Sequence, residues 1–180
     1  MMKKCAKYLK FILRFGFICF ILFILVNLGG YLYAYCSEKI DIKSANTFFM
    51  YDSKETLVFQ GNGKDNWILL RDMPDDVINA TLAVEDKKFY EHNGFDFLRM
   101  LKALFENIVS GEIVQGASSI TQQYARNLFL DFEQTWERKW KEMWLTFKLE
   151  AHYSKDEILE GYLNTINYGN VYGIGNASKY

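Results

Sequence analysis

The sequence predicts a mainly α-helical domain that follows a single transmembrane helix. Three observations indicate this class. An uncharged run of 22 residues lies near the N-terminus, β-rich runs are confined to residues 37–73, and signals of helices follow Pro74, the only proline. Half of the 180 residues are apolar, which is enough to bury the core of one domain.

The N-terminal segment has the pattern of a membrane anchor. Residues 1–14 hold five basic residues and no acid, and residues 15–36 carry no charge. As a helix this run would measure about 33 Å, and the hydrocarbon core of a bilayer is about 30 Å thick. The basic flank predicts that residues 1–14 form a cytoplasmic tail. A cleaved signal peptide is the alternative, but the run is long for one and lacks a convincing small-residue cleavage site.

Charge and cysteine content exclude some classes of function for residues 37–180, the part expected outside the membrane. All 22 acidic residues follow residue 36, where 16 basic residues leave a net charge of −6. This balance argues against general nucleic-acid binding. All three cysteines lie in or beside the apolar run, so neither a disulfide nor a thiolate ligand is expected outside. With two histidines a zinc site is not expected, whereas a carboxylate-bound divalent cation such as Mg or Mn stays open.

Residues 37–73 predict a small extended β stalk near the membrane. TFFMY and TLVFQ are β-rich runs, and NWILL follows a Gly-Asn-Gly loop. Residues 74–180 predict the helical domain. Its first helix opens at Pro74, has two acids in its first turn and runs towards Glu85.

The second and third helices are predicted from their ends. FDFLRMLKALFENIVSG forms the second, and Gly111 stops it. Ser119 and Gln122 form a capping box for the third. The apolar face of the second helix consists of Phe97, Leu101, Leu104, Phe105 and Ile108.

The fourth and fifth helices show the clearest apolar periodicity. In the fourth, Glu137 and Lys141 are spaced to form a favourable pair, and Ser154 with Glu157 caps the fifth. Trp140, Trp144 and Phe147 are predicted to be core, and the aromatic rings near the end are predicted to pack. The apolar positions are Trp140, Met143, Trp144, Phe147 and Ala151, then Ile158, Leu159, Tyr162 and Leu163; the other packing rings are Tyr168 and Tyr172.

Three segments contain residue types that carry chemistry. AVEDKKFYEHNGFD joins an acid pair to aromatic residues and a histidine. QGASSITQQYAR leads into a helix N-terminus, whose N–H groups and dipole suit a phosphate. In ERKWKE, Arg138 and Glu142 share one helix face. Each signal is weak alone, because an acid pair at a helix end is usually solvated.

Together, these groups fit glycosyl transfer from a diphosphate donor. An acceptor hydroxyl is a weak nucleophile unless a base removes its proton as it attacks. The leaving diphosphate gains negative charge, which arginine, lysine or a metal must stabilise. Two carboxylates also serve glycoside hydrolases, where water replaces the acceptor.

The motifs resemble those of the peptidoglycan glycosyltransferase (transglycosylase) domain of class A penicillin-binding proteins and their monofunctional relatives. EDKKFYEHNG matches E-D-x-x-F-x-x-H-x-G, and GASSITQQ matches G-x-S-T-x-T-Q-Q except at Ser119. RKWKE matches R-K-x-x-E, and KDEILEGYLNTINYG matches K-x-x-I-L-x-x-Y-L-N. The resemblance covers about residues 38–180 and implies a lysozyme-like helical glycosyltransferase domain that polymerises lipid II on the outer face of the bacterial cytoplasmic membrane.

The resemblance also implies roles for individual residues. Glu85 would be the general base on the acceptor hydroxyl, and Glu142 the second essential carboxylate, aiding the donor or organising the cations around its diphosphate. The implied phosphate contacts are Arg126, Arg138 and Lys139. The implied cleft residues are Ser118, Ser119, Thr121, Gln122 and Gln123, with Asp86, Phe89 and His92 shaping the site around Glu85. As alternatives, Asp86 only caps or pairs with Lys87 or Lys88, and His92 is a structural hydrogen-bonding residue.

Several positions depart from the family pattern. Ser119 keeps the hydroxyl of the usual threonine, and Arg126 replaces a commoner lysine with different geometry. Gln134 lies where relatives often have a basic residue, so one diphosphate contact is expected to be missing. The family domain normally continues past Tyr180, so the chain is expected to be a truncated copy, a fragment of a longer product or an unusually short enzyme. Its second lobe is expected to be incomplete, with an exposed apolar surface.

The resulting expectation is a membrane-anchored, inverting peptidoglycan glycosyltransferase that extends glycan strands and releases undecaprenyl diphosphate, with no cofactor evidently required. Its expected partners are lipid II, the growing glycan strand, membrane lipid and cell-wall synthesis proteins, in cell wall biogenesis and cell shape. The main alternative is a truncated, inactive protein that binds lipid II or a partner. A lytic muramidase ranks third, because an enzyme that uses water would not need the cations.

Overall fold

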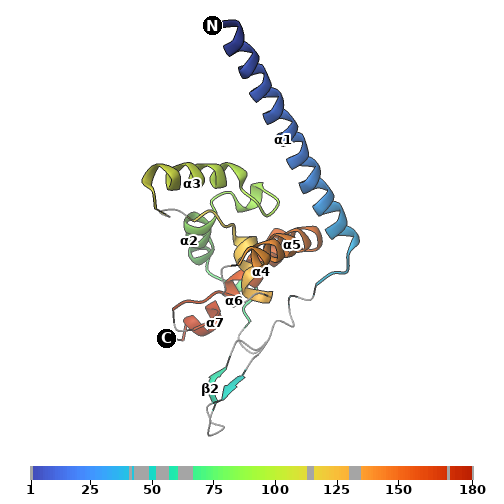
Figure 1. Cartoon of the computed structure of the whole chain (residues 1–180). Helices are drawn as coiled ribbons and strands as arrows, with labels where there is room; N and C mark the ends of the chain where they lie inside the picture. The colour runs from blue at the N-terminus through green and yellow to red at the C-terminus, as the bar shows by residue number, and fades with distance from the viewer. Residues whose placement is uncertain are drawn as a thin grey trace. The chain divides into compact units, whose positions relative to one another are not determined.

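The structure is a computed structural model that describes residues 2–40, 42, 49–51, 57–60, 67–112, 116–129, 135–169 and 171–179. It divides into two compact units, Met1–Glu38 and Lys39–Tyr180. The described chain is mainly helical, as predicted (Figure 1).

The first unit is one long helix, α1 (Met2–Cys36). Within it, Arg14–Cys36 is long and apolar enough, by length and composition, to cross a membrane. This span of 23 residues begins one residue before the predicted anchor. A signal sequence would pass the same test, so the predicted orientation and retention of the anchor stay predictions.

Two short strands, β1 (Phe49–Tyr51) and β2 (Leu57–Gln60), pair antiparallel with an irregular register between Met50 and Tyr51. They lie in the first two runs that were predicted to be β-rich. Their role as a stalk near the membrane stays a prediction. Residues 67–70 of the third run do not form a strand: residues 67–69 have no regular structure, and Leu70 begins the 3-10 helix η2 (Leu70–Asp72).

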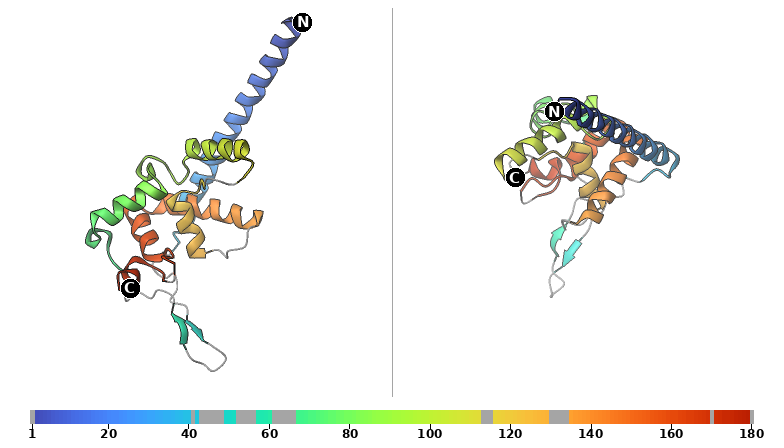
Figure 2. Two further views of the ribbon diagram at one scale, coloured as in Figure 1. Left: turned by 90° about the vertical axis from the view of Figure 1, so that its left-hand side faces the viewer. Right: turned by 45° about the horizontal axis from the view of Figure 1, so that its top comes forward.

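The remaining elements of the second unit are helical, and three of them build its core. These elements are α2 (Asp75–Glu85), η3 (Phe89–Glu91), α3 (Phe97–Ser110), α4 (Ile120–Phe129), α5 (Trp136–His152), α6 (Lys155–Thr165) and α7 (Ile174–Ala177). Helix α4 packs against both α5 and α6 (Figures 1 and 2). The core joins Ile120, Tyr124, Ala125 and Leu128 of α4 to Leu149, Ile158, Leu159, Tyr162 and Leu163, with Ile42, Met73 and Phe89.

Side chains of α6 explain why the third β-rich run does not pair as a strand. The two Glu160 carboxylate oxygens accept hydrogen bonds from the Trp67 indole N–H and the Leu70 backbone N–H, both at 2.8 Å. The Asn164 side chain accepts from the Ile68 N–H at 2.9 Å and donates to the Ile68 carbonyl at 2.8 Å. A helix therefore satisfies the backbone groups that a neighbouring strand would otherwise pair.

The predicted helix ends are confirmed. The Ser119 hydroxyl accepts from the Gln122 N–H at 3.2 Å, and the Gln122 side-chain oxygen accepts from the Ser119 N–H at 3.0 Å. This is the predicted capping box, and Ser154 with Glu157 forms another. Helix α3 ends at Gly111, whose φ of 72° lies in the left-handed region that glycine favours.

The predicted apolar faces are only partly right. All four predicted positions of α6 are fully buried, and Phe147 of α5 is buried with 6% of its surface exposed. Trp140, however, is 63% exposed, because α5 buries the face that contains Glu142, Thr146 and Leu149. Tyr168 is 37% exposed, so its predicted packing is only partial. Helix α3 leaves most of its apolar face exposed, and only Ala103 on it is buried.

Gly161 permits close packing between α4 and α6. A Cβ at this position would lie 2.1 Å from the Tyr124 hydroxyl oxygen and 2.3 Å from its Cζ. Overpacking costs about 1–3 kcal/mol, which exceeds the roughly 1 kcal/mol that alanine gains over glycine in a helix. We therefore expect Gly161→Ala to lower the melting temperature of the full chain, followed in detergent by circular dichroism. Gly116→Ala, with nothing within 4 Å, should melt like the parent, and an unchanged Gly161→Ala would contradict this packing.

Candidate active site

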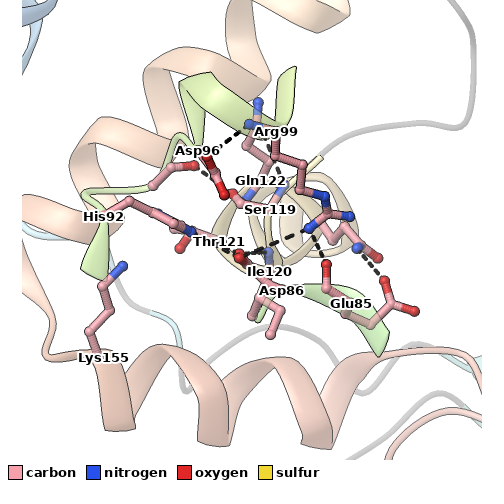
Figure 3. A network of polar contacts seen from close by, with 12 residues as sticks. Glu85, Asp86, His92, Asp96, Arg99, Ser119, Ile120, Thr121, Gln122 and Lys155 are labelled. Carbon is pink, nitrogen blue, oxygen red and sulfur yellow. Dashed lines mark hydrogen bonds and ion pairs between the residues drawn. The ribbon is translucent and has the colours of Figure 1, made fainter. Parts of the chain in front are cut away.

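Helix α2 ends at an acid pair whose two members have different environments. Asp86 is 1% exposed, whereas Glu85 is half-buried. Both oxygens of Asp86 lie 3.0 Å from His92 Nε2, and Oδ2 accepts at 3.1 Å from the N–H of Ile120, the first residue of α4 (Figure 3). Asp86 therefore caps α4, as one predicted alternative had it, and pairs with His92 instead of with a neighbouring lysine.

The surroundings of His92 fit its predicted structural role. Its ring meets the buried Phe89 ring edge-on, with centroids 6.4 Å apart. While Nε2 contacts Asp86, the buried Nδ1 has no hydrogen-bond partner among the described residues. Phe89 itself lies in the core, with the Lys155 ammonium 4.5 Å from its ring centroid. His92 thus contacts the Asp86 carboxylate, and Phe89 packs against the His92 ring.

Arg99 is a part of the site that the sequence analysis missed. Its guanidinium donates to the backbone carbonyl of Glu85 and, at 3.5 Å, to the carbonyl of Gly116. It also lies 3.9 Å from the Asp86 carboxylate (Figure 3). Arg99 thereby ties α3 to the end of α2 and to the segment that enters α4. It lies outside all four motifs, so only its charge within an apolar helix could have drawn attention to it.

The Glu85 carboxylate is held by a side chain from α4. Glu85 Oε2 accepts a hydrogen bond from the Gln123 side-chain N–H at 2.7 Å. The Gln123 side-chain oxygen in turn accepts from the Tyr162 hydroxyl of α6 at 3.3 Å. Burial, then the nearby Glu85 carboxylate, raises the pKa of Tyr162, while Arg126 lowers it. Tyr162 therefore keeps its proton and acts as a donor at neutral pH.

Three residues predicted to line the cleft are buried and have internal partners. Ser119 and Gln122 cap α4, and the Ser119 hydroxyl also donates to the Gly94 carbonyl. The Thr121 hydroxyl donates to Glu150, which forms an ion pair with Lys155 at 2.7 Å. Ser118, like Gln123, is half-buried. Contact of these residues with a substrate stays a prediction.

The second predicted carboxylate is fully buried. Glu142 is 0% exposed, and its two oxygens face two cations of its own helix. Arg138 donates to Oε2 at 2.9 Å, and the Lys139 ammonium contacts Oε1. Lys139 is the more exposed of the two cations. The described residues bring no group of three or more metal-ligating side chains together.

Comparison with known proteins identifies the family. Residues 53–180 match the family model described as Transglycosylase. The chain belongs to this family. The four motifs all lie within the matched residues, so the resemblance read from them is confirmed.

Relatives of this transglycosylase chain are penicillin-binding proteins. It is 55% identical over 117 residues to penicillin-binding protein 2D of Bacillus subtilis, covering 64% of this chain and 17% of the relative. It is 38% identical over 181 residues to penicillin-binding protein 1A of Vibrio cholerae, covering 96% of this chain and 22% of the relative. The chain thus spans about a fifth of the length of these relatives.

Proposed function

We propose that this transglycosylase domain is a peptidoglycan glycosyltransferase that polymerises lipid II with inversion and releases undecaprenyl diphosphate. The observation that carries the proposal is the difference in burial and hydrogen bonding between Glu85 and Asp86. Asp86 is buried as a helix cap, whereas Glu85 is only half-buried and is held by Gln123. Membership of the family supports the same reaction.

In this reaction Glu85 is the general base. Its carboxylate takes the proton from the acceptor sugar hydroxyl while that oxygen forms a bond to the anomeric carbon of the donor. The bond from this carbon to the diphosphate breaks, and its electron pair leaves with the diphosphate. A single displacement of this kind inverts the anomeric centre. The base makes the weak hydroxyl nucleophile competent.

The cations stabilise the leaving diphosphate in this proposal. Arg138 and Lys139 share the Glu142 carboxylate, and Arg126 lies close enough to Tyr162 to affect its pKa. Because Glu142 is fully buried with both oxygens paired, it fits the role of organising cations better than that of transferring a proton. No step of the proposed reaction runs through a metal ion.

Helix α1 supplies the membrane anchor of the proposal. Its apolar span, preceded by basic residues, would hold the N-terminus inside and the second unit on the outer face. A lipid-linked donor in the same bilayer would then reach the domain by lateral diffusion.

The test is product analysis of the full chain in detergent with fluorescently labelled lipid II. Glycan polymers together with free lipid diphosphate are the expected products. Cleavage of preformed glycan by water would instead indicate a muramidase. Binding of lipid II by the folded chain without any product would indicate the inactive alternative.

A further inference from the structure

We propose that Tyr162 is a positioning residue for Glu85, because its hydroxyl orients the Gln123 side-chain amide that holds the carboxylate. This inference rests on the proposed role of Glu85 as the base. The sequence assigned Tyr162 to packing alone, and its ring is indeed fully buried in the core. Its hydroxyl, however, reaches Gln123.

The direction of the two hydrogen bonds makes the connection specific. A side-chain amide has one end that accepts and one that donates. The Tyr162 hydroxyl donates to the amide oxygen at 3.3 Å, and the amide N–H donates to Glu85 Oε2 at 2.7 Å. If the amide turned over, its oxygen would face the carboxylate and repel it. The Tyr162 hydroxyl, bonded to the amide oxygen, therefore holds the amide where its N–H reaches the ionised carboxylate.

The other groups around this carboxylate do not orient the amide. The carboxylate of Asp86, the next residue after Glu85, caps α4. Arg99 of α3 donates to the Glu85 backbone carbonyl. Arg126 of α4 and Glu85 both act on Tyr162 electrostatically. Among the described residues, the Gln123 side chain forms hydrogen bonds with Glu85 and Tyr162. Removing the Tyr162 hydroxyl should therefore act on Glu85 through Gln123.

The first readout is the pH dependence of lipid II polymerisation by the full chain. In Tyr162→Phe the ring stays and the hydroxyl is lost, so we expect the rate to fall about 2- to 10-fold, as for a lost neutral hydrogen bond. The acidic limb of the pH–rate profile should move to higher pH, because the ionised carboxylate is less stabilised. In a Gln123→Leu background the same substitution should have no further effect.

The matched control is Tyr124→Phe, which changes another fully buried tyrosine of the core. The Tyr124 hydroxyl has no hydrogen-bond partner among the described residues, so its loss should leave the pH profile unchanged. If Tyr162 were merely structural, Tyr162→Phe would lower the rate without shifting the pH profile, or would lower the rate equally in the parent and in the Gln123→Leu background. Either result would overturn the proposal.

A second readout does not depend on activity. NMR can follow the titration of the Glu85 carboxyl carbon, labelled with carbon-13, in the full chain. Its signal is assigned as the one that Glu85→Gln lacks. Its midpoint should move to higher pH in Tyr162→Phe and stay in Tyr124→Phe. If Glu85→Gln kept the parent rate, the proposed role of Glu85 as the base would fail, yet this titration would still decide whether Tyr162 acts on the Glu85 carboxylate. An unmoved midpoint in Tyr162→Phe would refute it.

Discussion

Glu85→Gln is expected to lower the rate of lipid II polymerisation by about 10²- to 10⁴-fold, the usual contribution of a general base. The amide has the size of the carboxylate but cannot accept the proton of the acceptor hydroxyl. The fold should persist, because Glu85 is half-buried and its backbone carbonyl still binds Arg99. The measurement is the initial rate for the full chain in detergent, with melting followed by circular dichroism.

Glu91→Gln is the matched control for this experiment. Glu91 is exposed and pairs with Lys88 at 3.6 Å. The substitution therefore removes the same charge as Glu85→Gln, six residues further along the chain. Its rate should equal that of the parent. If Glu85→Gln polymerised lipid II as fast as Glu91→Gln, another group would have to be the base, and the proposed mechanism would be wrong.

The sequence predicted best those features that depend on neighbouring residues. Ser119 and Gln122 are three positions apart, and so are Ser154 and Glu157, so each capping box could be read directly from the sequence. The left-handed Gly111 is likewise a local requirement. The motifs located Glu85 beside Asp86, but the sequence could not show that Asp86 is fully buried and Glu85 only partly.

Features that depend on distant residues were missed. Trp67 and Glu160 are separated by 93 positions, and Ile68 and Asn164 by 96, so the run NWILL carried only its local β propensity. Similarly, no local pattern shows that Gly161 faces the Tyr124 ring. Such pairings arise when helices pack, and one sequence does not record them.

The burial of Glu142 could not be predicted for the same reason, although the motif located it. Trp140 suggested that an apolar stripe of α5 faces the core, but the buried stripe contains an acid. A buried carboxylate is costly unless it is paired, and Arg138 and Lys139 supply the pairs. The interior of the domain therefore contains a network of ion pairs formed by Arg138, Lys139 and Glu142.

Replacing Glu142 should consequently destabilise the domain. Glu142→Gln keeps the volume but leaves Arg138, itself largely buried, without its carboxylate, whereas the more exposed Lys139 can turn to water. Breaking a buried ion pair costs about 3–5 kcal/mol, and the lower value is expected here because Lys139 can relax. The melting temperature of the full chain should fall by about 6–12 °C, measured by circular dichroism in detergent.

Two further variants separate this effect from a general loss of charge on α5. Glu137→Gln removes an exposed carboxylate from the same helix and should leave melting unchanged. The double variant Arg138→Met/Glu142→Met removes both partners, so it should recover much of the stability lost in Glu142→Gln. Equal melting temperatures for Glu142→Gln and the parent would contradict the ion network. If the stable double variant still fails to polymerise lipid II, Arg138 and Glu142 act in the reaction as well as in the fold.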